Sequence, residues 1–337
     1  MAEPLLRVRD LVTSFPTQSG GIFRRGELRA VAGVSFDIEQ GGSLGLVGES
    51  GCGKSTVARS IVGLVRPRSG QVTLRGQAIA GARGSAAAEV RRTIQMVFQD
   101  PFSSLNRRMT VRELISEPWI VHAGIEPREN WERRTTELLE MVGLSSRHAD
   151  RRPTQFSGGQ LQRISIARAL AVRPQLLIAD EAVSALDVSV QAQILNLLQD
   201  LRAELGLTLL FISHDLSVVR HICDRAAVMY LGRIVEIGHR DALFDNPVHP
   251  YTRALMSAAP DLYPWRTERA HRPLDDGEVP SPAHPPSGCR FRTRCPLVQD
   301  SCARVEPALV PVGPDHEVAC PVAHPTTALS SRGDAHV

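Results

Sequence analysis

Residues 48–55 read GESGCGKS, and this octapeptide sets the class of domain that the chain forms. It matches the pattern G-x-x-x-x-G-K-[ST], follows the apolar segment SLGLV at residues 43–47, and opens a helical stretch to about Leu64. Glycines in such a loop allow backbone N–H groups to surround phosphates at a helix N-terminus. The pattern therefore predicts a nucleotide phosphate-binding loop formed by Gly48, Glu49, Ser50, Gly51, Cys52, Gly53, Lys54, Ser55 and Thr56.

Lys54 is the only lysine among the 39 basic residues, and all the others are arginine. An ammonium group is a compact charge, whereas a guanidinium is a wide planar fork, so a site that accepts only the compact ion retains lysine. We expect Lys54 to reach the β- and γ-phosphates of ATP and the Ser55 hydroxyl to bind Mg²⁺. The alternatives are chance survival of one lysine and a glycine-rich turn without a ligand.

Composition narrows the class of protein further. The length of 337 residues and the hydrophobic content of 42% allow one large domain with an appendage. No apolar run reaches the roughly 20 residues needed to cross a bilayer, and the N-terminus MAEPLLRVRD lacks the apolar core of a signal peptide. We therefore expect a cytoplasmic protein that reaches a membrane only through partners. The net charge of +3, without a basic stripe, argues against a nucleic-acid partner.

Residues 1–245 alternate short β-branched runs with longer helical stretches, which predicts an α/β domain with a parallel sheet. The helical pattern from Met109 to Ala171 predicts a helical subdomain inserted in this sheet domain. Beyond about residue 246 prolines are frequent and strand signals disappear. This change predicts a small irregular C-terminal extension at 246–325 and a disordered tail at 326–337. The strand candidates are residues 43–47, 95–99, 176–180 and 209–213.

The segment LLIADE at residues 176–181 is an apolar run that ends in two acids. It predicts a buried parallel strand whose carboxyl end meets the ligand crevice. There we expect Asp180 to hold Mg²⁺, directly or through water, and Glu181 to orient and deprotonate the attacking water. His214 follows the next strand candidate, where an imidazole can touch the γ-phosphate. Taken alone, an acidic strand end is usually a solvated turn, and a lone histidine is usually incidental.

The segment FSGGQLQR at residues 156–163 resembles the signature motif of ATP-binding-cassette (ABC) ATPases, whose usual form is LSGGQ. A Ser-Gly-Gly turn that opens a helix presents backbone amides and a hydroxyl to a phosphate. The resemblance implies a P-loop NTPase fold of the ABC type and a dimer with two ATP molecules in its interface. In that dimer, ATP on the opposite subunit would be contacted by Ser157, Gly158, Gly159 and Gln160.

Further segments resemble other ABC elements, in the expected order. Gln99 in VFQDP resembles the Q-loop glutamine, which contacts Mg²⁺ and the attacking water and couples to the membrane subunit. SALD at residues 184–187 resembles the D-loop, which places Asp187 at the dimer interface, and His214 in ISHD resembles the switch histidine. The aromatic residue that stacks on adenine is predicted to be Phe15, with Phe23 as its competitor; the alternative for Phe15 is an ordinary core residue.

Two more stretches resemble a narrower group, the ATPases of oligopeptide, dipeptide and nickel importers. They are VFQDPFSSLN at residues 97–106 and NPVHPYTRAL at residues 246–255. This resemblance implies a sister ABC ATPase, two membrane permease subunits and an extracytoplasmic substrate-binding protein as partners, and a peripheral position at the cytoplasmic face of the cell membrane. The form of the signature and Q-loop segments is closer to the second ATPase of such pairs.

Four of the six cysteines fall together in the C-terminal extension: Cys289, Cys295, Cys302 and Cys320. Clustered thiols in a cytosolic chain suggest metal, although the two-to-four-residue spacing of zinc ligands is missing. Proline follows two of them, as at the end of some iron–sulfur runs, and nearby arginines at 290, 292, 294 and 304 could offset the charge of a thiolate cluster. The pattern resembles a [4Fe–4S] site of peptide-importer ATPases. Reduced thiols, disulfide pairs and zinc are the alternatives.

The leading hypothesis is an ATP-hydrolysing importer subunit, most consistent with di- or oligopeptide transport. A soluble ABC ATPase that acts on nucleic acid or ribosomes is the alternative from another class, although such proteins usually carry coiled-coil insertions or two cassettes. A third hypothesis is a regulatory subunit that binds ATP without turnover, but the presence of the predicted catalytic acid Glu181 argues against it. The sequence does not name the cargo, because the binding protein and membrane subunits select it.

Overall fold

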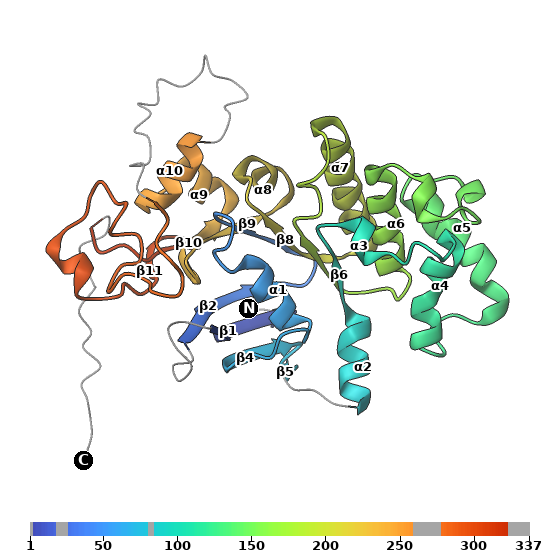
Figure 1. Cartoon of the computed structure of the whole chain (residues 1–337), viewed down its shortest axis with the longest axis horizontal. Helices are drawn as coiled ribbons and strands as arrows, with labels where there is room; N and C mark the ends of the chain where they lie inside the picture. The colour runs from blue at the N-terminus through green and yellow to red at the C-terminus, as the bar shows by residue number, and fades with distance from the viewer. Residues whose placement is uncertain (1–2, 18–25, 80–83, 259–277, 323–337) are drawn as a thin grey trace.

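The computed structural model describes residues 3–17, 26–79, 84–258 and 278–322 (Figure 1). Phe23 and the tail predicted at 326–337 lie outside these ranges. The strands are β1 (Leu6–Thr17), β2 (Gly26–Ile38), β3 (Ser43–Val47), β4 (Ser69–Leu74), β5 (Gln77–Ala78), β6 (Ile94–Val97), β7 (Leu176–Asp180), β8 (Thr208–Ser213), β9 (Arg225–Tyr230), β10 (Arg233–His239), β11 (Val310–Gly313) and β12 (His316–Val318). The α-helices are α1 (Lys54–Ile61), α2 (Gly84–Thr93), α3 (Pro101–Ser104), α4 (Val111–Val121), α5 (Trp131–Met141), α6 (Gly158–Leu170), α7 (Val188–Leu205), α8 (Leu216–Ile222), α9 (Arg240–Asp245) and α10 (Pro250–Ala258).

The central sheet has the order β11-β12-β10-β9-β3-β8-β7-β6. Strands β9, β3, β8, β7 and β6 run parallel, and every residue of β3, β7 and β8 is buried. Parallel strands covered on both faces read as continuous apolar runs, which is why these segments were recognisable in the sequence. Along β8, Leu210 and Ile212 pack into one core, whereas Leu209 and Phe211 pack into the core on the opposite face.

An antiparallel sheet of order β2-β1-β4-β5 covers one face of the central sheet, with α1 packed against β1, β2 and β7 (Figure 1). Strands β1 and β2 pair over most of their length, and β1 also pairs with β4. The core on this face includes Leu6, Val8, Val57 and Ile61, which are at most 2% exposed. This packing holds the N-terminus of α1 at the carboxyl end of β3.

Helices α4, α5 and α6 form the inserted helical subdomain, which stands beside the sheets in Figure 1. Helix α4 begins in a capping box in which Thr110 and Glu113 exchange hydrogen bonds. It continues through Pro118, and the buried indole of Trp119 donates to the carbonyl of Ala171 at 2.9 Å. The helices thus occupy the region in which the sequence predicts them, near residues 109–171.

The C-terminal extension differs from the sequence-based expectation, because it contains two strands. Strand β12 pairs antiparallel with β10, and β11 pairs with β12, so both extend the central sheet. Their alternation is too short to register in the sequence, and Pro311 lies within β11. The pairing is secured by fully buried Glu236, whose carboxylate lies 2.8 Å from His316 Nε2 and accepts the N–H groups of Val248 and His249.

No helix in the described ranges is long and apolar enough to cross a membrane.

Candidate nucleotide-binding and catalytic site

The predicted phosphate loop connects β3 to α1, which begins at Lys54. Gly53 caps this helix in the left-handed region, with φ 109°, and a Cβ there would lie 2.1 Å from the Ala30 carbonyl oxygen. Only glycine fits such a position. The Lys54 side chain is 3% exposed, and its ammonium donates to the carbonyls of Gly48 at 2.7 Å and Glu49 at 3.0 Å. The lysine therefore lies inside the loop, where its charge can meet phosphate oxygens.

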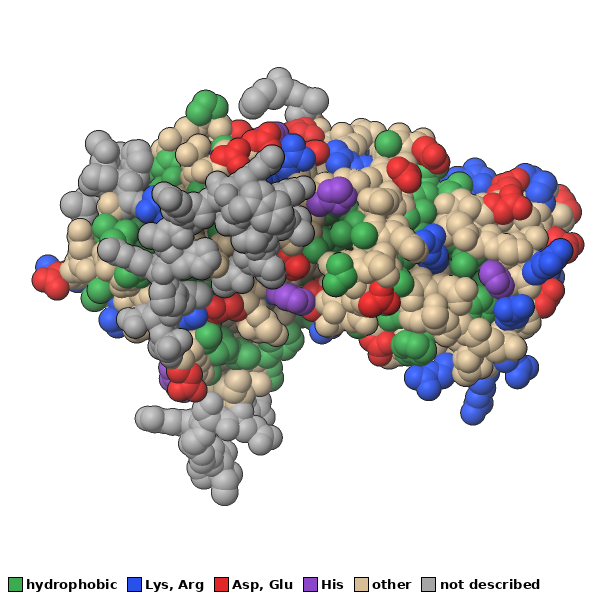
Figure 2. Space-filling model, turned by 90° about the horizontal axis from the view of Figure 1, so that it is seen from above, with side chains coloured by type: hydrophobic (Ala, Val, Ile, Leu, Met, Phe, Trp, Pro, Cys, Tyr) green, Lys and Arg blue, Asp and Glu red, His purple; other side chains and the backbone are tan. Residues whose placement is uncertain are grey.

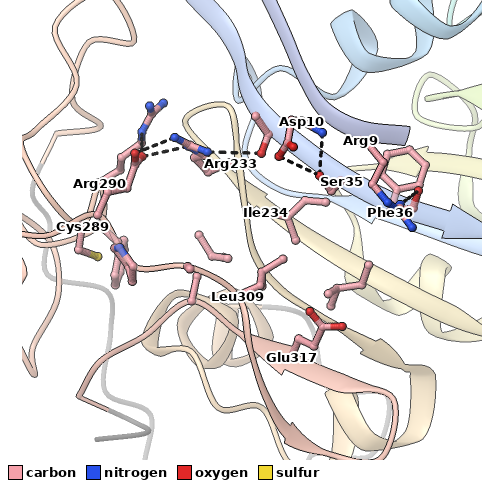
Figure 3. A pocket seen from close by; sticks show the side chains of 18 of the residues that line it. Arg9, Asp10, Ser35, Phe36, Arg233, Ile234, Cys289, Arg290, Leu309 and Glu317 are labelled. Atoms are coloured by element: carbon pink, nitrogen blue, oxygen red, sulfur yellow. Dashed lines mark hydrogen bonds and ion pairs between the residues drawn. The ribbon is translucent and has the colours of Figure 1, made fainter. Parts of the chain in front are cut away.

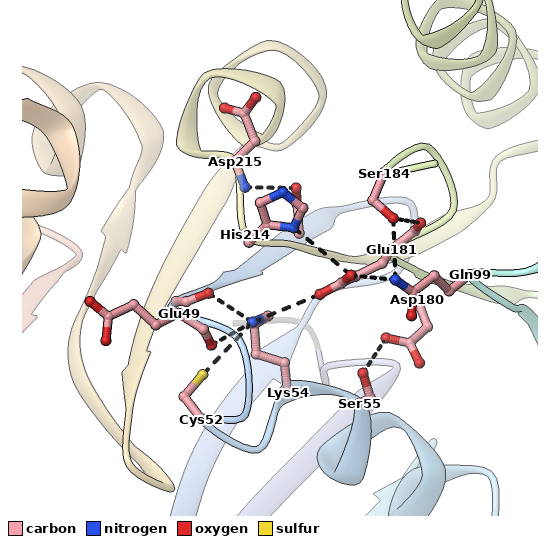
Figure 4. A network of polar contacts seen from close by, with 12 residues as sticks. Glu49, Cys52, Lys54, Ser55, Gln99, Asp180, Glu181, Ser184, His214 and Asp215 are labelled. Carbon is pink, nitrogen blue, oxygen red and sulfur yellow. Dashed lines mark hydrogen bonds and ion pairs between the residues drawn. The ribbon is translucent and has the colours of Figure 1, made fainter. Parts of the chain in front are cut away.

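Asp180 ends β7 directly beside this loop (Figure 4). Its carboxylate accepts a hydrogen bond from the Ser55 hydroxyl at 2.7 Å. Burial raises the pKa of Asp180, and the hydrogen bond from Ser55 offsets that rise in part. A carboxylate and a hydroxyl at the N-terminus of a helix are oxygen donors of the kind that Mg²⁺ prefers.

Glu181 occupies the centre of a polar network at the carboxyl ends of β7 and β8 (Figure 4). Its carboxylate accepts from Gln99 Nε2 at 2.9 Å and lies 3.8 Å from His214 Nδ1 and 4.0 Å from Lys54 Nζ. The backbone of Glu181 has φ 48°, an unusual value for a residue with a side chain, and its N–H donates to the Ile212 carbonyl at 3.0 Å. Local strain of this kind is concentrated at functional sites.

The structure therefore brings together the predicted acids, the glutamine and the histidine. Strand β6 ends at Val97 rather than at Gln99 as predicted, and this earlier end places Gln99 on the loop that faces Glu181. The Gln99 amide also donates to the Ser184 hydroxyl at 3.4 Å, a contact that the sequence did not suggest.

The signature segment lies apart from the phosphate loop. Ser157 caps α6 in a reciprocal capping box with Gln160, and its side chain is exposed. A Cβ on Gly159 would lie 2.3 Å from Cγ1 of Val190 in α7, so the close approach of the two helices requires glycine. Helix α6 belongs to the helical subdomain, whereas α1 lies between the two sheets (Figure 1). Ser157 is thus exposed on a part of the chain distinct from the phosphate loop.

Two other predicted contacts have defined positions. Asp187 caps α7 by accepting the Val190 N–H at 3.0 Å, and it is exposed. Phe15 lies near the end of β1, opposite Leu28, and is 36% exposed. An exposed aromatic ring is available to stack on a base, so adenine stacking by Phe15 stays a prediction.

The C-terminal extension reaches the phosphate loop through two residues whose roles the sequence did not reveal. The Tyr251 hydroxyl accepts the backbone N–H of Glu49 at 2.9 Å. The Arg294 guanidinium donates to both oxygens of the Glu49 carboxylate, at 2.9 and 3.0 Å. Tyr251 belongs to the segment NPVHPYTRAL, so the motif itself was a signal, but only tertiary contacts disclose its target.

The four clustered cysteines are neighbours in space. Burial raises the pKa of Cys289 to about 11, and the charges of Cys302, Cys320 and Cys295 contribute to the rise. Cys289, Cys295 and Cys302 form no disulfide in the described ranges. Within the same ranges, no group of three or more His, Cys, Asp or Glu side chains is arranged to hold a metal ion.

The arginines near the cysteines have other partners than the sequence suggested. Arg290 pairs with Glu306 at 3.1 Å and Arg294 with Glu49, so two of the four charges are already compensated by carboxylates. Arg290 and Cys289 line a pocket of about 470 Å³ between β2, β10 and the extension (Figure 3). Whether these two arginines also offset the charge of a thiolate cluster stays a prediction. Figure 2 shows acidic and basic side chains interspersed over the face that it presents.

The site combines a buried lysine in a phosphate loop, an acid bound to its serine, and a second acid held by glutamine, histidine and lysine. This combination defines an ATPase of the ABC class. The ABC transporter family model matches residues 31–184, and the model for the C-terminal region of oligopeptide/dipeptide transporters matches residues 235–302.

Known proteins resemble nearly the whole chain. The oligopeptide transport ATP-binding protein AppF of Bacillus subtilis is 50% identical over 321 residues, covering 94% of this chain and 97% of AppF. The probable peptide ABC transporter ATP-binding protein y4tS of Sinorhizobium fredii is 53% identical over 329 residues, covering 97% of this chain and 92% of the relative. The chain belongs to the ATP-binding proteins of the oligopeptide/dipeptide ABC transporter family, and ATP and Mg²⁺ are the ligands implied by its ATPase class.

Solved structures agree on the fold. The chain resembles CbiO1 of Clostridium perfringens, part of the CbiONQ transporter complex, with a TM-score of 0.62 and 28% identity over 73% of this chain and 92% of that one. It also resembles the ATP-binding cassette MJ0796, a dimer in a post-hydrolysis state bound to ADP and Pi, with a TM-score of 0.62 and 29% identity over 70% of this chain and 98% of that one.

Proposed function

We propose that this chain hydrolyses ATP as one half of a dimer and thereby powers the import of di- or oligopeptides. One observation carries the dimer: the phosphate loop with Asp180 and Glu181 forms one half-site, while Ser157 is exposed on a separate part of the same chain. Two such chains placed head to tail would complete both sites. The dimeric arrangement of MJ0796 with ADP and Pi supports this reading.

Each catalytic residue has a role that its position supports. Lys54 would hold the β- and γ-phosphates, and Ser55, Asp180 and Gln99 would hold Mg²⁺ directly or through water. Glu181 would accept a proton from the attacking water as its oxygen bonds to the γ-phosphorus. The bond from that phosphorus to the bridging oxygen breaks, giving ADP and phosphate.

His214, 3.8 Å from Glu181, would contact the γ-phosphate and respond to its loss. The signature residues Ser157, Gly158, Gly159 and Gln160 would stabilise the same phosphate from the opposite subunit, with amides at the start of α6. Phe15 would stack on adenine, and Asp187 would lie in the interface between the two chains.

A groove of about 330 Å³ supports the interaction with a permease. Leu64, Phe98 and Val121 line it, and they are 63%, 37% and 69% exposed. Phe98 adjoins Gln99, so a permease segment in this groove would sense the state of the ATP site. Exposed apolar side chains gathered in one groove mark an interaction surface. Two permease subunits, a substrate-binding protein and a sister ATPase would complete the importer, with this chain at the cytoplasmic face of the membrane.

The relatives support peptide as the cargo, because both carry peptide or oligopeptide transport in their names. The form of the signature and Q-loop segments supports this chain as the second ATPase of a pair. We place the nucleotide-binding domain at residues 1–245 and the importer-type extension at 246–325. A soluble ABC ATPase that acts on nucleic acid or ribosomes has no feature of the described residues in its favour.

We also propose that Cys289, Cys295, Cys302 and Cys320 hold a [4Fe–4S] cluster. Four cysteine sulfurs are the usual ligand set, and each binds a different iron, so they need not converge on a single ion. Their proximity supports this donor set, and Cys289, Cys302 and Cys320 are buried while Cys295 is half-buried. Desolvation raises the pKa of Cys289 and Cys295, which favours their neutral thiols until iron binds. When bound, the cluster would supply a cross-link that fixes residues 289–320 in place. Anaerobic purification should give about four irons and matching sulfide per chain. A purified chain that contains zinc without iron, or that contains no metal, would reject the cluster.

Two measurements test the transport function. Cells that carry the Lys54→Ala or Glu181→Gln chain in place of the natural one should lose uptake of labelled di- and oligopeptides while the protein level is maintained. Purified Glu181→Gln with ATP should form a stable dimer or heterodimer with the sister subunit, whereas Lys54→Ala should not. Normal peptide uptake in both variants would reject the importer role, and co-purification with ribosomes or nucleic acid would favour the alternative.

A further inference from the structure

The second residue of the phosphate loop, Glu49, is held on two sides by the C-terminal extension. Its backbone N–H donates to the Tyr251 hydroxyl at 2.9 Å, so that amide is engaged by protein. Its carboxylate accepts two hydrogen bonds from the Arg294 guanidinium, one on each oxygen, at 2.9 and 3.0 Å. Its carbonyl accepts from Lys54 Nζ at 3.0 Å. Figure 4 shows Glu49 beside Lys54. Glu49 thus connects the extension to the lysine of the loop.

Arg294 is held in place by burial and by neighbouring aromatic rings. Its side chain is 7% exposed, and its guanidinium lies 6.0 Å from the ring centres of Tyr230 and Phe291. Tyr230, Tyr251 and Phe291 contact one another, with ring centres 4.7 to 5.3 Å apart. A bidentate guanidinium–carboxylate pair that is shielded in this way has a defined geometry as well as a charge.

We propose that Arg294 is a positioning residue for the ATP site, which acts through Glu49 to hold the phosphate loop in its binding conformation. Phosphate binding requires Lys54 to leave the carbonyls of Gly48 and Glu49 and to turn toward the nucleotide. The loop keeps its shape during that exchange because Arg294 and Tyr251 hold Glu49 from outside. The extension is therefore part of the nucleotide site, and Arg294 contributes to ATP affinity without touching ATP.

A purely structural role for Arg294, as an anchor of the extension, makes a different prediction. Loss of an anchor lowers the stability of the chain and reduces the fraction of active protein, which lowers apparent kcat and leaves the KM for ATP unchanged. Loss of a positioning contact raises the KM for ATP and the Kd of a fluorescent ATP analogue, with kcat nearly unchanged. The split between KM and kcat separates the two roles.

The test compares Arg294→Gln, Arg294→Lys and Glu49→Gln in the full-length chain, with ATP turnover, analogue binding and the unfolding midpoint measured for each. Arg294→Gln should raise KM and Kd about threefold to tenfold, since hydrogen bonds between charged groups are among the strong ones and part of that strength reaches the loop. Arg294→Lys retains the charge but cannot make the bidentate pair with Glu49, so it should raise KM and Kd by an intermediate amount.

The double variant Glu49→Gln with Arg294→Gln should show little more than the larger single effect, because both changes remove the same contact. Arg292→Gln is the matched control, since Arg292 lies two residues away and donates to Ser287 within the extension. Tyr251→Phe keeps the ring and removes the hydroxyl that accepts from Glu49, and it should also raise KM. An equal rise in KM for Arg292→Gln, additive effects in the double variant, or a fall in kcat at unchanged KM would overturn the proposal.

Discussion

The contact between the signature helix and the helix that follows the D-loop allows a sharp test of the site. Gly159 lies in the first turn of α6, and Val190 lies in the first turn of α7. We predict that Gly159→Ala destabilises the chain and reduces ATP hydrolysis, and that Val190→Ala in the same chain restores much of both. The perturbation adds one methyl group at a position where the two helices nearly touch.

The magnitude follows from the geometry. The added Cβ would lie 2.3 Å from Val190 Cγ1, whereas ordinary contact begins at 3.4 Å. Valine in a helix has one preferred rotamer, so rotation does not relieve the clash and the helices must separate by roughly 1 Å. Overpacking of this kind costs about 1–3 kcal/mol. Separation would also strain the cap in which Asp187 accepts the Val190 N–H at 3.0 Å.

Urea unfolding of four chains measures this coupling: the natural chain, Gly159→Ala, Val190→Ala and the double variant. Val190→Ala alone should cost about 1 kcal/mol, because Val190 is only half-buried. The double variant should then be more stable than the sum of the single effects predicts, by about 1–2 kcal/mol. ATP turnover should follow the same order. Strictly additive effects on stability, or Gly159→Ala with natural stability, would refute the packing argument.

Three further predictions follow from individual carboxylates. Glu181→Gln should lower kcat by about 10²- to 10⁴-fold in steady-state assays, the range for a lost general base; a tenfold loss or less would assign the base elsewhere. Burial raises the pKa of Asp180, so its carboxylate takes up a proton at a higher pH than an ordinary aspartate does. The affinity for Mg²⁺, measured by titration, should therefore weaken as the pH falls through that raised pKa. An affinity that does not change with pH would contradict this prediction. Burial raises the pKa of Glu236, but hydrogen bonds with His316 and with backbone N–H groups outweigh this effect and lower the pKa. The ionised Glu236 therefore stabilises the fold above the ordinary glutamate pKa, and this stabilisation is lost as the pH falls through the lowered pKa of the folded chain. Glu236→Gln should therefore cost most in chemical unfolding near neutral pH and little in strong acid.

Much of the site could be predicted from sequence because its elements are local. The phosphate loop, the strand that ends in Asp180 and Glu181, and the Ser-Gly-Gly turn each lie within a few consecutive residues. Their chemistry follows from residue type and spacing. The predicted strand end at Gln99 was wrong, because β6 ends at Val97, and this earlier end lets Gln99 donate to Glu181.

The C-terminal extension was predicted less well, since its contacts are long-range. Strands β11 and β12 exist because β10 offers them an edge, and buried Glu236 ties the extension to that edge. Nothing near Arg294 in the sequence indicates that its partner is Glu49, 245 residues earlier. From the sequence, the arginines beside the cysteines had no visible partner, and a compensating role for the cluster was the natural hypothesis.

The residue order alone established a phosphate loop, two acids at a strand end and a signature turn, because each is encoded by neighbours that fold together whatever surrounds them. Folding in three dimensions established which of these meet. It brought Gln99, His214 and Lys54 around Glu181, left Ser157 exposed on a separate part of the chain, and placed Arg294 against the loop. Such pairings depend on how sheets and helices pack, and packing joins residues that chain spacing does not relate.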